Sequence, residues 1–589
     1  MILISMAKNF LADKKMIIGT IIVLQLSQVL FNLWLPNLNA HIIDNGIVAG
    51  NQPYIWRTGL LMIGVSCLQI ISLVTAMYLS SRLAMAMGRD LRLAVFRHVQ
   101  RFSLTDQQRF GASTLITRAT NDVTQIQRIV MGALSFFVIA PLLGVGGIIM
   151  SVIEDPQLSL LLLVVVPLLA VLILGTMRAL VPRSILQQER IDRINTLLRE
   201  QLAGVRVIRA FIRERTVADK FTDTNQQLRD VWLSIGLLWA FMFPTAQLIV
   251  GFSSAAVVWF GGIRIAAGTM NIGAITAYIS YLTMILGAVM LSGFMVMLFP
   301  RAQVAANRIQ EILDTVPAIS SPVSPHVFPQ RPLRFVAHDV SLQFPGAQEP
   351  VVDHVSLELS PGSTVALIGA TGSGKSTILR LFPRLLDPTS GTVTINGVDI
   401  RSLSLAEVRS CIAYVPQKTF LFSGTIASNV AGLVQVNEQG IDDERVRHAL
   451  QIAQAWDFVE KLENGIDAVV ESGGMNFSGG QRQRLTIARA VYRCLPDVSG
   501  NRQADLIMFD DSFSALDYAT DARLRRALQS ELDVAVLIVT QRVSTVRDAD
   551  VIHVLDSGRI VGSGTHDELQ DSNQTYQEII ASQLKLKEA

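Results

Sequence analysis

Six apolar runs lie within residues 1–300, and each is close to the roughly 20 residues that a helix needs to cross a bilayer. A mean hydropathy of +0.41 with only 17% charged residues is also typical of a membrane protein. The first run follows Lys8, Lys14 and Lys15, as a secretory signal would, but it lacks a small-residue cleavage site, so we expect a retained helix. The runs predict spanning helices near 16–35, 59–80, 130–153, 156–178, 236–260 and 273–299.

The distribution of arginine predicts how these helices are oriented. Residues 82–128 carry eight arginines, and residues 178–232 carry ten arginines and Lys220. The alternate connections hold only Arg57 and Arg264. Because cytoplasmic loops are enriched in basic residues, we expect both termini and both long loops on the cytoplasmic side. Apolar residues recur at helical spacing in these loops, which predicts a six-helix bundle with long cytoplasmic helical extensions.

A phosphate-binding motif follows the apolar half of the chain. Gly369–Thr377 reads GATGSGKST, comes directly after the apolar run Thr364–Ile368 and leads into an apparent helix. Such a strand, loop and helix holds nucleotide phosphates on backbone N–H groups, with the lysine on the β- and γ-phosphates and the following hydroxyl on Mg²⁺. The motif predicts an α/β P-loop ATPase that binds ATP and Mg²⁺ through Gly369, Thr371, Gly372, Ser373, Gly374, Lys375, Ser376 and Thr377.

Two further elements follow this motif in order. Phe477-Ser478-Gly479-Gly480-Gln481 lies about a hundred residues downstream, and Leu506–Asp510 is an apolar strand that ends in a carboxylate. Together with the phosphate-binding loop, they resemble the ATP-binding cassette (ABC) family over roughly residues 330–580. The resemblance implies that Ser376, Gln417 and Asp510 hold Mg²⁺ and that Phe344 stacks on adenine. It also implies a D-loop along a dimer interface, formed by Ser514, Ala515, Leu516 and Asp517.

Two positions depart from the family pattern. Asp511 stands where the family has a glutamate that polarises the attacking water, and Gln541 stands where it has a histidine that contacts the γ-phosphate. Aspartate is one methylene shorter, and glutamine cannot transfer a proton. We therefore expect a site that binds ATP and scarcely cleaves it.

The resemblance also implies a partner, because ABC cassettes pair head to tail around two ATP molecules. The intact signature Phe477–Gln481 would then complete the site of a second half-transporter that has the consensus glutamate and histidine. This pattern resembles the degenerate-site subunit of heterodimeric bacterial multidrug-type exporters. A homodimer that turns over slowly through Asp511 stays open as the nearest alternative.

Motifs between the spans resemble the intracellular loops of ABC exporters, at Arg109–Val123 and at Glu200–Glu214. In that family, short transverse helices at the loop ends dock onto cassettes, and we expect them near 103–112 and 211–221. We expect a membrane domain over 1–313, a linker over 314–333 and a cassette over 334–589. Within the cassette, Cys494–Gln503 has the features of an inserted surface loop, and Gln583–Glu588 is most simply a solvated tail.

The substrate is the least constrained property. No charged residue falls at the centre of a predicted span, and the last span contains Met284, Met290, Met295 and Met297. Methionine adapts to varied apolar partners, so a lipophilic or amphipathic drug, lipid or peptide is favoured, by family analogy. Import of a metal chelate, or an ATP-gated channel or sensor, remain alternatives. No nucleic-acid partner is expected, although the net charge of +2 is near balance and itself says nothing about nucleic acid. Three scattered cysteines indicate neither a disulfide framework nor a zinc site. The expected location is the cytoplasmic membrane of a bacterium.

Overall fold

The computed structural model of the protein describes residues 2–432, 441–497 and 499–588. Within these ranges the side chains of 294–298, 300 and 584–588, and with them Met295 and Met297, lie outside the description. The chain divides into two compact units. The first comprises residues 1–100 and 111–316, and the second comprises residues 101–110 and 317–589. Each unit is described separately below.

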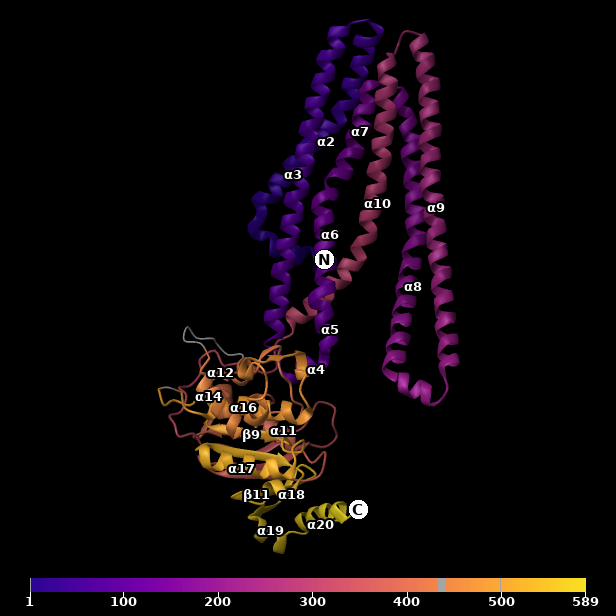
Figure 1. The fold of residues 1–589 in the computed structure, drawn as a ribbon. Helices are drawn as coiled ribbons and strands as arrows, with labels where there is room; N and C mark the ends of the chain where they lie inside the picture. Colours follow the sequence, from indigo (N-terminus) through magenta and orange to yellow (C-terminus); the bar gives the residue numbers. More distant parts are fainter. Residues whose placement is uncertain (1, 433–440, 498, 589) are drawn as a thin grey trace. The chain divides into compact units, whose positions relative to one another are not determined.

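Long helices make up the first unit (Figure 1). Among the described residues, six helical stretches are long and apolar enough to cross a membrane, as the apolar runs predict. The longest continuous helices have 49 and 53 residues, far more than a bilayer requires, so they provide the expected extensions. The helices are α1 (Ile2–Leu11), α2 (Lys15–Ile42), α3 (Gln52–Val99), α5 (Ala112–Thr117), α6 (Val123–Gly132), α7 (Ile139–Glu154), α8 (Leu162–Ala210), α9 (Glu214–Ala266) and α10 (Ile272–Asp314).

The third span is interrupted, which its sequence does not reveal. The run 130–153 crosses the end of α6, a π-helical turn over Ala133–Phe137 and then α7. Gln25 of α2 is almost fully buried and donates hydrogen bonds from its amide to the carbonyl oxygens of Leu134 and Ser135 in this turn. Gln25 therefore binds backbone groups of another helix, as polar residues inside membrane bundles commonly do.

The first intracellular loop supplies a short helix to the cassette unit. Helix α4 (Leu104–Phe110) confirms the helix expected near 103–112, and residues 101–110 belong to the second unit. Asp106 is 8% exposed and accepts hydrogen bonds from the backbone of Ser103 and from the backbone of Ala318. The segment 211–221 differs from the expectation. It consists of a turn followed by the start of α9 at Glu214, without a separate short helix.

The described residues of the cassette form three sheets. The six-stranded sheet has the order β12-β11-β3-β10-β9-β6, in which all neighbours are parallel except β11 and β12. A four-stranded sheet has the order β2-β1-β4-β5, and β7 pairs with β8. The strands are β1 (Phe335–Leu342), β2 (Val352–Leu359), β3 (Thr364–Ile368), β4 (Ser390–Ile395), β5 (Val398–Asp399), β6 (Ile412–Val415), β7 (Gly424–Thr425), β8 (Val469–Val470), β9 (Leu506–Asp510), β10 (Ala535–Thr540), β11 (Val551–Asp556) and β12 (Arg559–Gly564).

The central strands β3, β9 and β10 are buried along their whole length because both faces of the sheet are covered. On β9, Ile507 and Phe509 belong to one apolar cluster, whereas Leu506 and Met508 belong to another. Side chains alternate between the faces of a strand, so the two clusters lie on opposite faces. The cassette helices are α11 (Lys375–Leu381), α12 (Leu405–Ser410), α13 (Ile426–Val430), α14 (Asp443–Ile452), α15 (Trp456–Val459), α16 (Gly479–Cys494), α17 (Tyr518–Glu531), α18 (Val543–Val546), α19 (His566–Ser572) and α20 (Gln574–Glu588).

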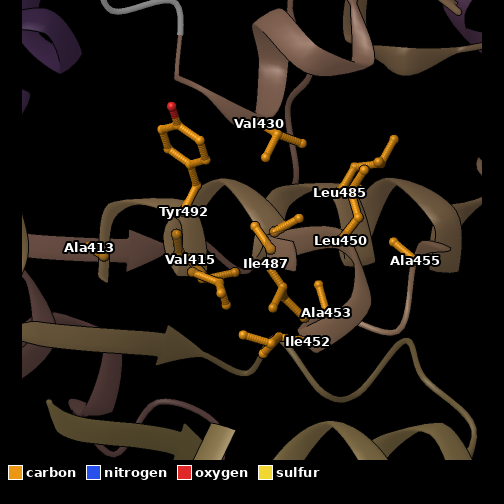
Figure 2. Packing of buried hydrophobic residues seen from close by; sticks show 14 of the residues in the cluster. Ala413, Val415, Val430, Leu450, Ile452, Ala453, Ala455, Leu485, Ile487 and Tyr492 are labelled. Carbon is orange, nitrogen blue, oxygen red and sulfur yellow. The ribbon is translucent and has the colours of Figure 1, made fainter. Parts of the chain in front are cut away.

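Figure 2 shows part of the first cluster, where α16 contributes Leu485 and Ile487 and α14 contributes Leu450. These side chains are fully buried, and Val415 of β6 joins them. The cluster fixes α16 against the sheet, and α16 begins directly after Ser478. Packing of this helix therefore determines where the signature residues lie.

Candidate nucleotide-binding site

The parallel sheet brings three sequence-distant segments to one edge. Strands β3, β10 and β9 are adjacent, and their carboxyl ends lead into the P-loop, into Gln541 and into Asp511. Ligands of open parallel sheets bind outside this edge. The structure therefore gathers the phosphate-binding motif and both atypical residues in one place.

Gly374 shows why the loop requires glycine. Its φ angle is 97°, a left-handed conformation, and a β-carbon there would come 2.5 Å from the carbonyl oxygen of Val351. Helix α11 begins at the next residue, Lys375. The turn thus directs the backbone N–H groups at the start of α11 toward the loop, as phosphate binding requires.

The side chain of Lys375 is buried inside the loop. Its Nζ donates hydrogen bonds to the carbonyl oxygens of Gly369 (2.8 Å) and Ala370 (2.6 Å) and to Ser373 Oγ (3.2 Å). Burial lowers the pKa of Lys375, although the carboxylates of Asp511 and Asp510 oppose the shift. When nucleotide binds, the ammonium group can replace its hydrogen bonds to these carbonyl oxygens with hydrogen bonds to phosphate oxygens.

Asp510 lies between two hydroxyl groups. Ser376 Oγ donates to its Oδ1 at 2.6 Å, and the Tyr414 hydroxyl donates to its Oδ2 at 3.0 Å. A serine hydroxyl beside a buried carboxylate fits Mg²⁺, which prefers hard oxygen ligands. Burial, followed by the charge of Asp510, raises the pKa of Tyr414, so this hydroxyl stays a donor at neutral pH. Tyr414 has no role in the sequence-based prediction, although a hydroxyl within the apolar strand Ile412–Val415 was a usable signal.

Asp511 and Gln541 each contact a neighbouring threonine. Asp511 has φ 47° and accepts a hydrogen bond from Thr540 Oγ1 at 3.2 Å. Burial raises the pKa of Asp511, the Thr540 hydrogen bond opposes the shift, and the neighbouring Asp510 adds to it. Gln541 Oε1 accepts a hydrogen bond from the P-loop residue Thr371 at 3.2 Å. The two atypical side chains thus lie at the P-loop edge.

The signature residues cap their own helix. Ser478 and Gln481 form a capping box, in which each side chain bonds the backbone N–H of the other. Ser478 and Gly479 are exposed, while Phe477 is buried against Phe458. The N-terminal N–H groups of α16 are thereby presented on the cassette surface.

The remaining expected residues lie on the connections around the site. Ser514 Oγ donates to the carbonyl oxygen of Asp511, and Asp517 caps α17 by accepting from the N–H of Thr520. A β-carbon added to Gly480 would lie 3.5 Å from the carbonyl oxygen of Ala515, so the D-loop lies beside the signature. Phe344, after β1, is half-buried, and Gln417, after β6, is exposed. Arg542, which the sequence analysis did not consider, donates from Nη2 to the carbonyl oxygen of Ser514 at 2.7 Å.

Comparison with known proteins supports this reading. The family profile for the ABC transporter transmembrane region matches residues 17–289, and the ABC transporter profile matches residues 352–496. An uncharacterized ABC transporter ATP-binding protein of Mycobacterium tuberculosis is 41% identical over 99% of this chain and 98% of its own length. An ATP-dependent lipid A-core flippase of Desulfotalea psychrophila is 30% identical over 84% of each chain. The solved structure of a bacterial Atm1-family ABC exporter with ATP bound superposes with a TM-score of 0.77 at 20% identity, over 97% of this chain and 98% of that one.

These matches cover both units of the molecule. The cassette match implies ATP hydrolysis coupled to transport, and the six apolar helices make the chain a multi-pass inner-membrane protein with a cytoplasmic ATPase domain. The chain therefore belongs to the ABC transporter family, as an exporter-type half-transporter in which one membrane domain is fused to one ATP-binding cassette.

Proposed function

We propose that this chain is the degenerate-site half of a heterodimeric ABC exporter, which binds ATP at its own P-loop and leaves most hydrolysis to its partner's site. The observation that carries the proposal is the pair Asp511 and Gln541 at the carboxyl ends of β9 and β10, beside an intact P-loop.

Asp511 is poorly suited to activate water. Its carboxylate accepts a hydrogen bond from Thr540. Because aspartate is one methylene shorter than glutamate, this carboxylate lies about 1.5 Å short of the position that a glutamate carboxylate would reach. A misplacement of about 1 Å can cost roughly a hundredfold in rate. A carboxyl group with a raised pKa is also protonated over a wider pH range, and a protonated group cannot accept the proton of water.

Gln541 is also poorly suited to assist ATP hydrolysis. Its amide accepts a hydrogen bond from Thr371 and can donate one to a phosphate oxygen. It carries no charge and transfers no proton, unlike a histidine at this position. We expect Gln541 to help retain nucleotide without helping to cleave it.

The binding elements are retained. We assign the loop N–H groups and Lys375 to the phosphates, Phe344 to the adenine ring, and Ser376, Asp510 and Gln417 to Mg²⁺. The contacts of Lys375 within the loop and of Ser376 with Asp510 support this assignment. When bound, Mg²⁺ would neutralise charge on the phosphate oxygens. The exposed helix N-terminus at Ser478 and Gly479 suits the γ-phosphate of an ATP bound to a partner with a complete catalytic set.

An amphipathic or lipophilic substrate is supported by the membrane unit. Its helices α8, α9 and α10 surround an uncharged recess of about 540 Å³, lined by Ile173, Met177, Trp239, Met242, Phe243, Gly287, Met290, Leu291 and Gly293. The similarity to a lipid A-core flippase favours the same substrate class and outward transport. Substrate accumulation in inverted vesicles, and its absence in right-side-out vesicles, tests the direction and excludes import.

The decisive test compares ATP turnover before and after repair of the site. The double variant Asp511→Glu with Gln541→His is expected to hydrolyse ATP at least about tenfold faster than the unaltered chain purified alone, because it regains the base and the imidazole. The unaltered chain is expected to bind Mg-ATP with little turnover. Mixed with a half-transporter that has the consensus residues, it is expected to form a complex with brisk turnover.

A matched control makes the same two changes of residue type at exposed positions, Asp571→Glu with Gln574→His, and should leave turnover unchanged. Adding Lys375→Met to the repaired variant should abolish the gained activity. If a homodimer of the unaltered chain hydrolyses ATP as fast as the repaired variant, Asp511 and Gln541 suffice for hydrolysis. The degenerate-site proposal and the slow-homodimer alternative would then both be wrong. Slow substrate transport by a membrane that contains this chain and no second half-transporter would contradict the heterodimer proposal.

A further inference from the structure

The last helix of the cassette contacts the segment that carries Gln541. Gln583 on α20 donates a hydrogen bond from Nε2 to the carbonyl oxygen of Gln541 at 2.6 Å. Its Oε1 accepts a hydrogen bond from the N–H of Val543 at 3.0 Å. Gln583 therefore does not lie in a solvated tail, and the sequence-based expectation was wrong for this residue.

These two contacts define the orientation of the Gln583 amide. An amide presents donors at one end and an acceptor at the other, and here each end faces a backbone group of opposite character. Rotating the amide by half a turn would bring oxygen against the carbonyl of Gln541 and NH₂ against the N–H of Val543. Gln583 is thus matched to this backbone conformation, and a residue without both functions cannot replace it.

Val543 lies at the start of a short helix, where its backbone N–H needs a hydrogen-bond acceptor from another element. It is the first residue of α18, a helix of four residues whose N-cap, Arg542, makes no side-chain capping hydrogen bond. The N–H groups of a first helical turn have no partner inside the helix. Gln583 supplies the acceptor from another element and so fixes the start of α18.

Helix α20 is itself firmly attached. Tyr576 is fully buried, and its hydroxyl lies 2.8 Å from His566 Nδ1. Ile579 and Ile580 pack against an apolar cluster that includes Val546 of α18 and Ile552 of β11. The helix is therefore a rigid support, on which Gln583 lies one turn beyond Ile579.

The contacts continue from α20 to the phosphate-binding loop. Gln583 holds the main chain of Gln541, and the side chain of Gln541 accepts the hydrogen bond of Thr371. We infer that Gln583 is a positioning residue, which holds Gln541 against the P-loop and thereby slows nucleotide release from this chain's own site. The inference rests on the proposed nucleotide-retaining role of Gln541.

Two variants of the full-length chain in lipid nanodiscs test whether the hydrogen bonds of Gln583 slow nucleotide release. One removes these bonds, and the other is a control on the same helix. Gln583→Leu removes both hydrogen bonds, and we expect Mg-ATP to dissociate roughly fivefold to tenfold faster, on the order of one net hydrogen bond. Amide exchange of the peptide that contains Val543 should accelerate by a similar factor without nucleotide. Gln574→Leu, on the exposed first turn of the same helix, is the matched control and should change neither quantity.

Gln583→Glu provides a test that a merely structural role would not satisfy. The ionised carboxylate accepts from Val543 but repels the carbonyl of Gln541, whereas the protonated acid donates to that carbonyl as the amide does. The ratio of its ATP dissociation rate to that of the unaltered chain should therefore fall toward one as the pH is lowered toward the glutamate pKa of about 4.3. A ratio that does not change with pH would contradict positioning through Gln541.

A double-mutant comparison distinguishes failure of this inference from failure of the proposed function. In a Gln541→Ala background, Gln583→Leu should no longer affect ATP release, because the side chain through which it acts is gone. If Gln583→Leu accelerates release equally in both backgrounds, or accelerates amide exchange without affecting release, the inference is wrong. If the unaltered chain retains no nucleotide at all, the proposed function fails, and faster amide exchange in Gln583→Leu would still establish the contact.

Discussion

At the scale of residues, the chemistry of the nucleotide-binding site depends on which groups donate hydrogen bonds to the carboxylates of Asp510 and Asp511. Asp510 receives two hydroxyl donors, from Ser376 and Tyr414, whereas Asp511 receives one, from Thr540. The two carboxylates are adjacent in sequence, and burial is the largest cause of the raised pKa of Asp511. Small changes in hydrogen bonding should therefore change metal binding and residual hydrolysis separately.

The variant Thr540→Val tests the protonation of Asp511. It keeps the branched shape of the side chain but removes the hydrogen bond that lowers the pKa of Asp511. The pKa should rise further, so the carboxylate that can act as base forms only at higher pH. The acidic limb of the slow ATPase of the unaltered chain should accordingly shift to higher pH. An acidic limb that stays in place would show that Asp511 is not the group that titrates.

The variant Tyr414→Phe tests the support of Asp510. Without the hydroxyl, Oδ2 of Asp510 loses a donor and the carboxylate is less well oriented toward Mg²⁺. Loss of such a supporting partner typically costs about 10–100-fold in metal affinity. We expect a Mg²⁺ titration of ATP binding to shift by about tenfold to higher concentration. ATP affinity in EDTA should be unchanged, and a change there would instead assign Tyr414 to the nucleotide.

At the scale of elements, helix α4 shows how a loop of the membrane half becomes part of the cassette unit. The buried carboxylate of Asp106 joins the start of α4 to the segment after α10, through Ser103 and Ala318. The ring of Phe102, which precedes α4, stacks on the ring of Phe110, the last residue of α4, with 5.7 Å between the centroids. Three hydrogen bonds on one carboxylate make Asp106 the point on which this attachment depends.

The variant Asp106→Asn should loosen α4, because Oδ2 of Asp106 accepts all three hydrogen bonds and a neutral amide oxygen accepts them more weakly than a carboxylate oxygen. We expect faster amide exchange in residues 102–110, corresponding to a loss of about 1–3 kcal/mol. Burial raises the pKa of Asp106, but hydrogen bonds from Ser103 and Ala318 outweigh it, so the net pKa is lowered. The attachment should therefore be complete above the unfolded-state pKa of about 3.9 and weaken as the pH falls toward the lower folded-state pKa.

The matched control is Asp219→Asn on the exposed start of α9, which should leave exchange in 102–110 unchanged. Equal exchange in the Asp106 variant and in the unaltered chain would show that the apolar contacts of Phe102 and Phe110 suffice for the attachment.

At the scale of the whole molecule, the orientation in the membrane follows from the arginine-rich loops. The connection at Ala49 should face the outside, and the turn at Phe211, between α8 and α9, should face the cytoplasm. Burial raises the pKa of Cys411 and of Cys494 to about 12, so neither forms a reactive thiolate at neutral pH. The exposed Cys67 is then the native thiol to replace before labelling.

In a Cys67→Ser background, Ala49→Cys should react with a membrane-impermeant maleimide on intact cells. Phe211→Cys, whose position is 72% exposed, should react only after the membrane is permeabilised. The reverse pattern of labelling would overturn the orientation. The background protein without an added cysteine is the control for residual reactivity.

The sequence by itself determined the parts that depend on local chemistry. Apolar runs of bilayer length predict spanning helices because unpaired backbone groups are too costly in lipid, and the arginine bias predicts their orientation. The phosphate-binding loop needs glycine at Gly374 because no other residue fits the left-handed turn beside Val351. The departures at Asp511 and Gln541 were recognisable without coordinates because the resemblance to the ABC family gives the residues expected at both positions.

Only the tertiary structure decided which distant residues meet. Gln583 and Thr540 carry no signal of their own in the sequence, yet strand order and helix packing bring them to the site. The π-helical turn at Ala133–Phe137 and the continuation of α9 through 214–221 were likewise invisible, because an apolar run specifies helix but not its interruption or extension. Hydrogen bonds between residues far apart in sequence depend on the packing of whole elements, and packing is a property of the folded chain rather than of any local segment.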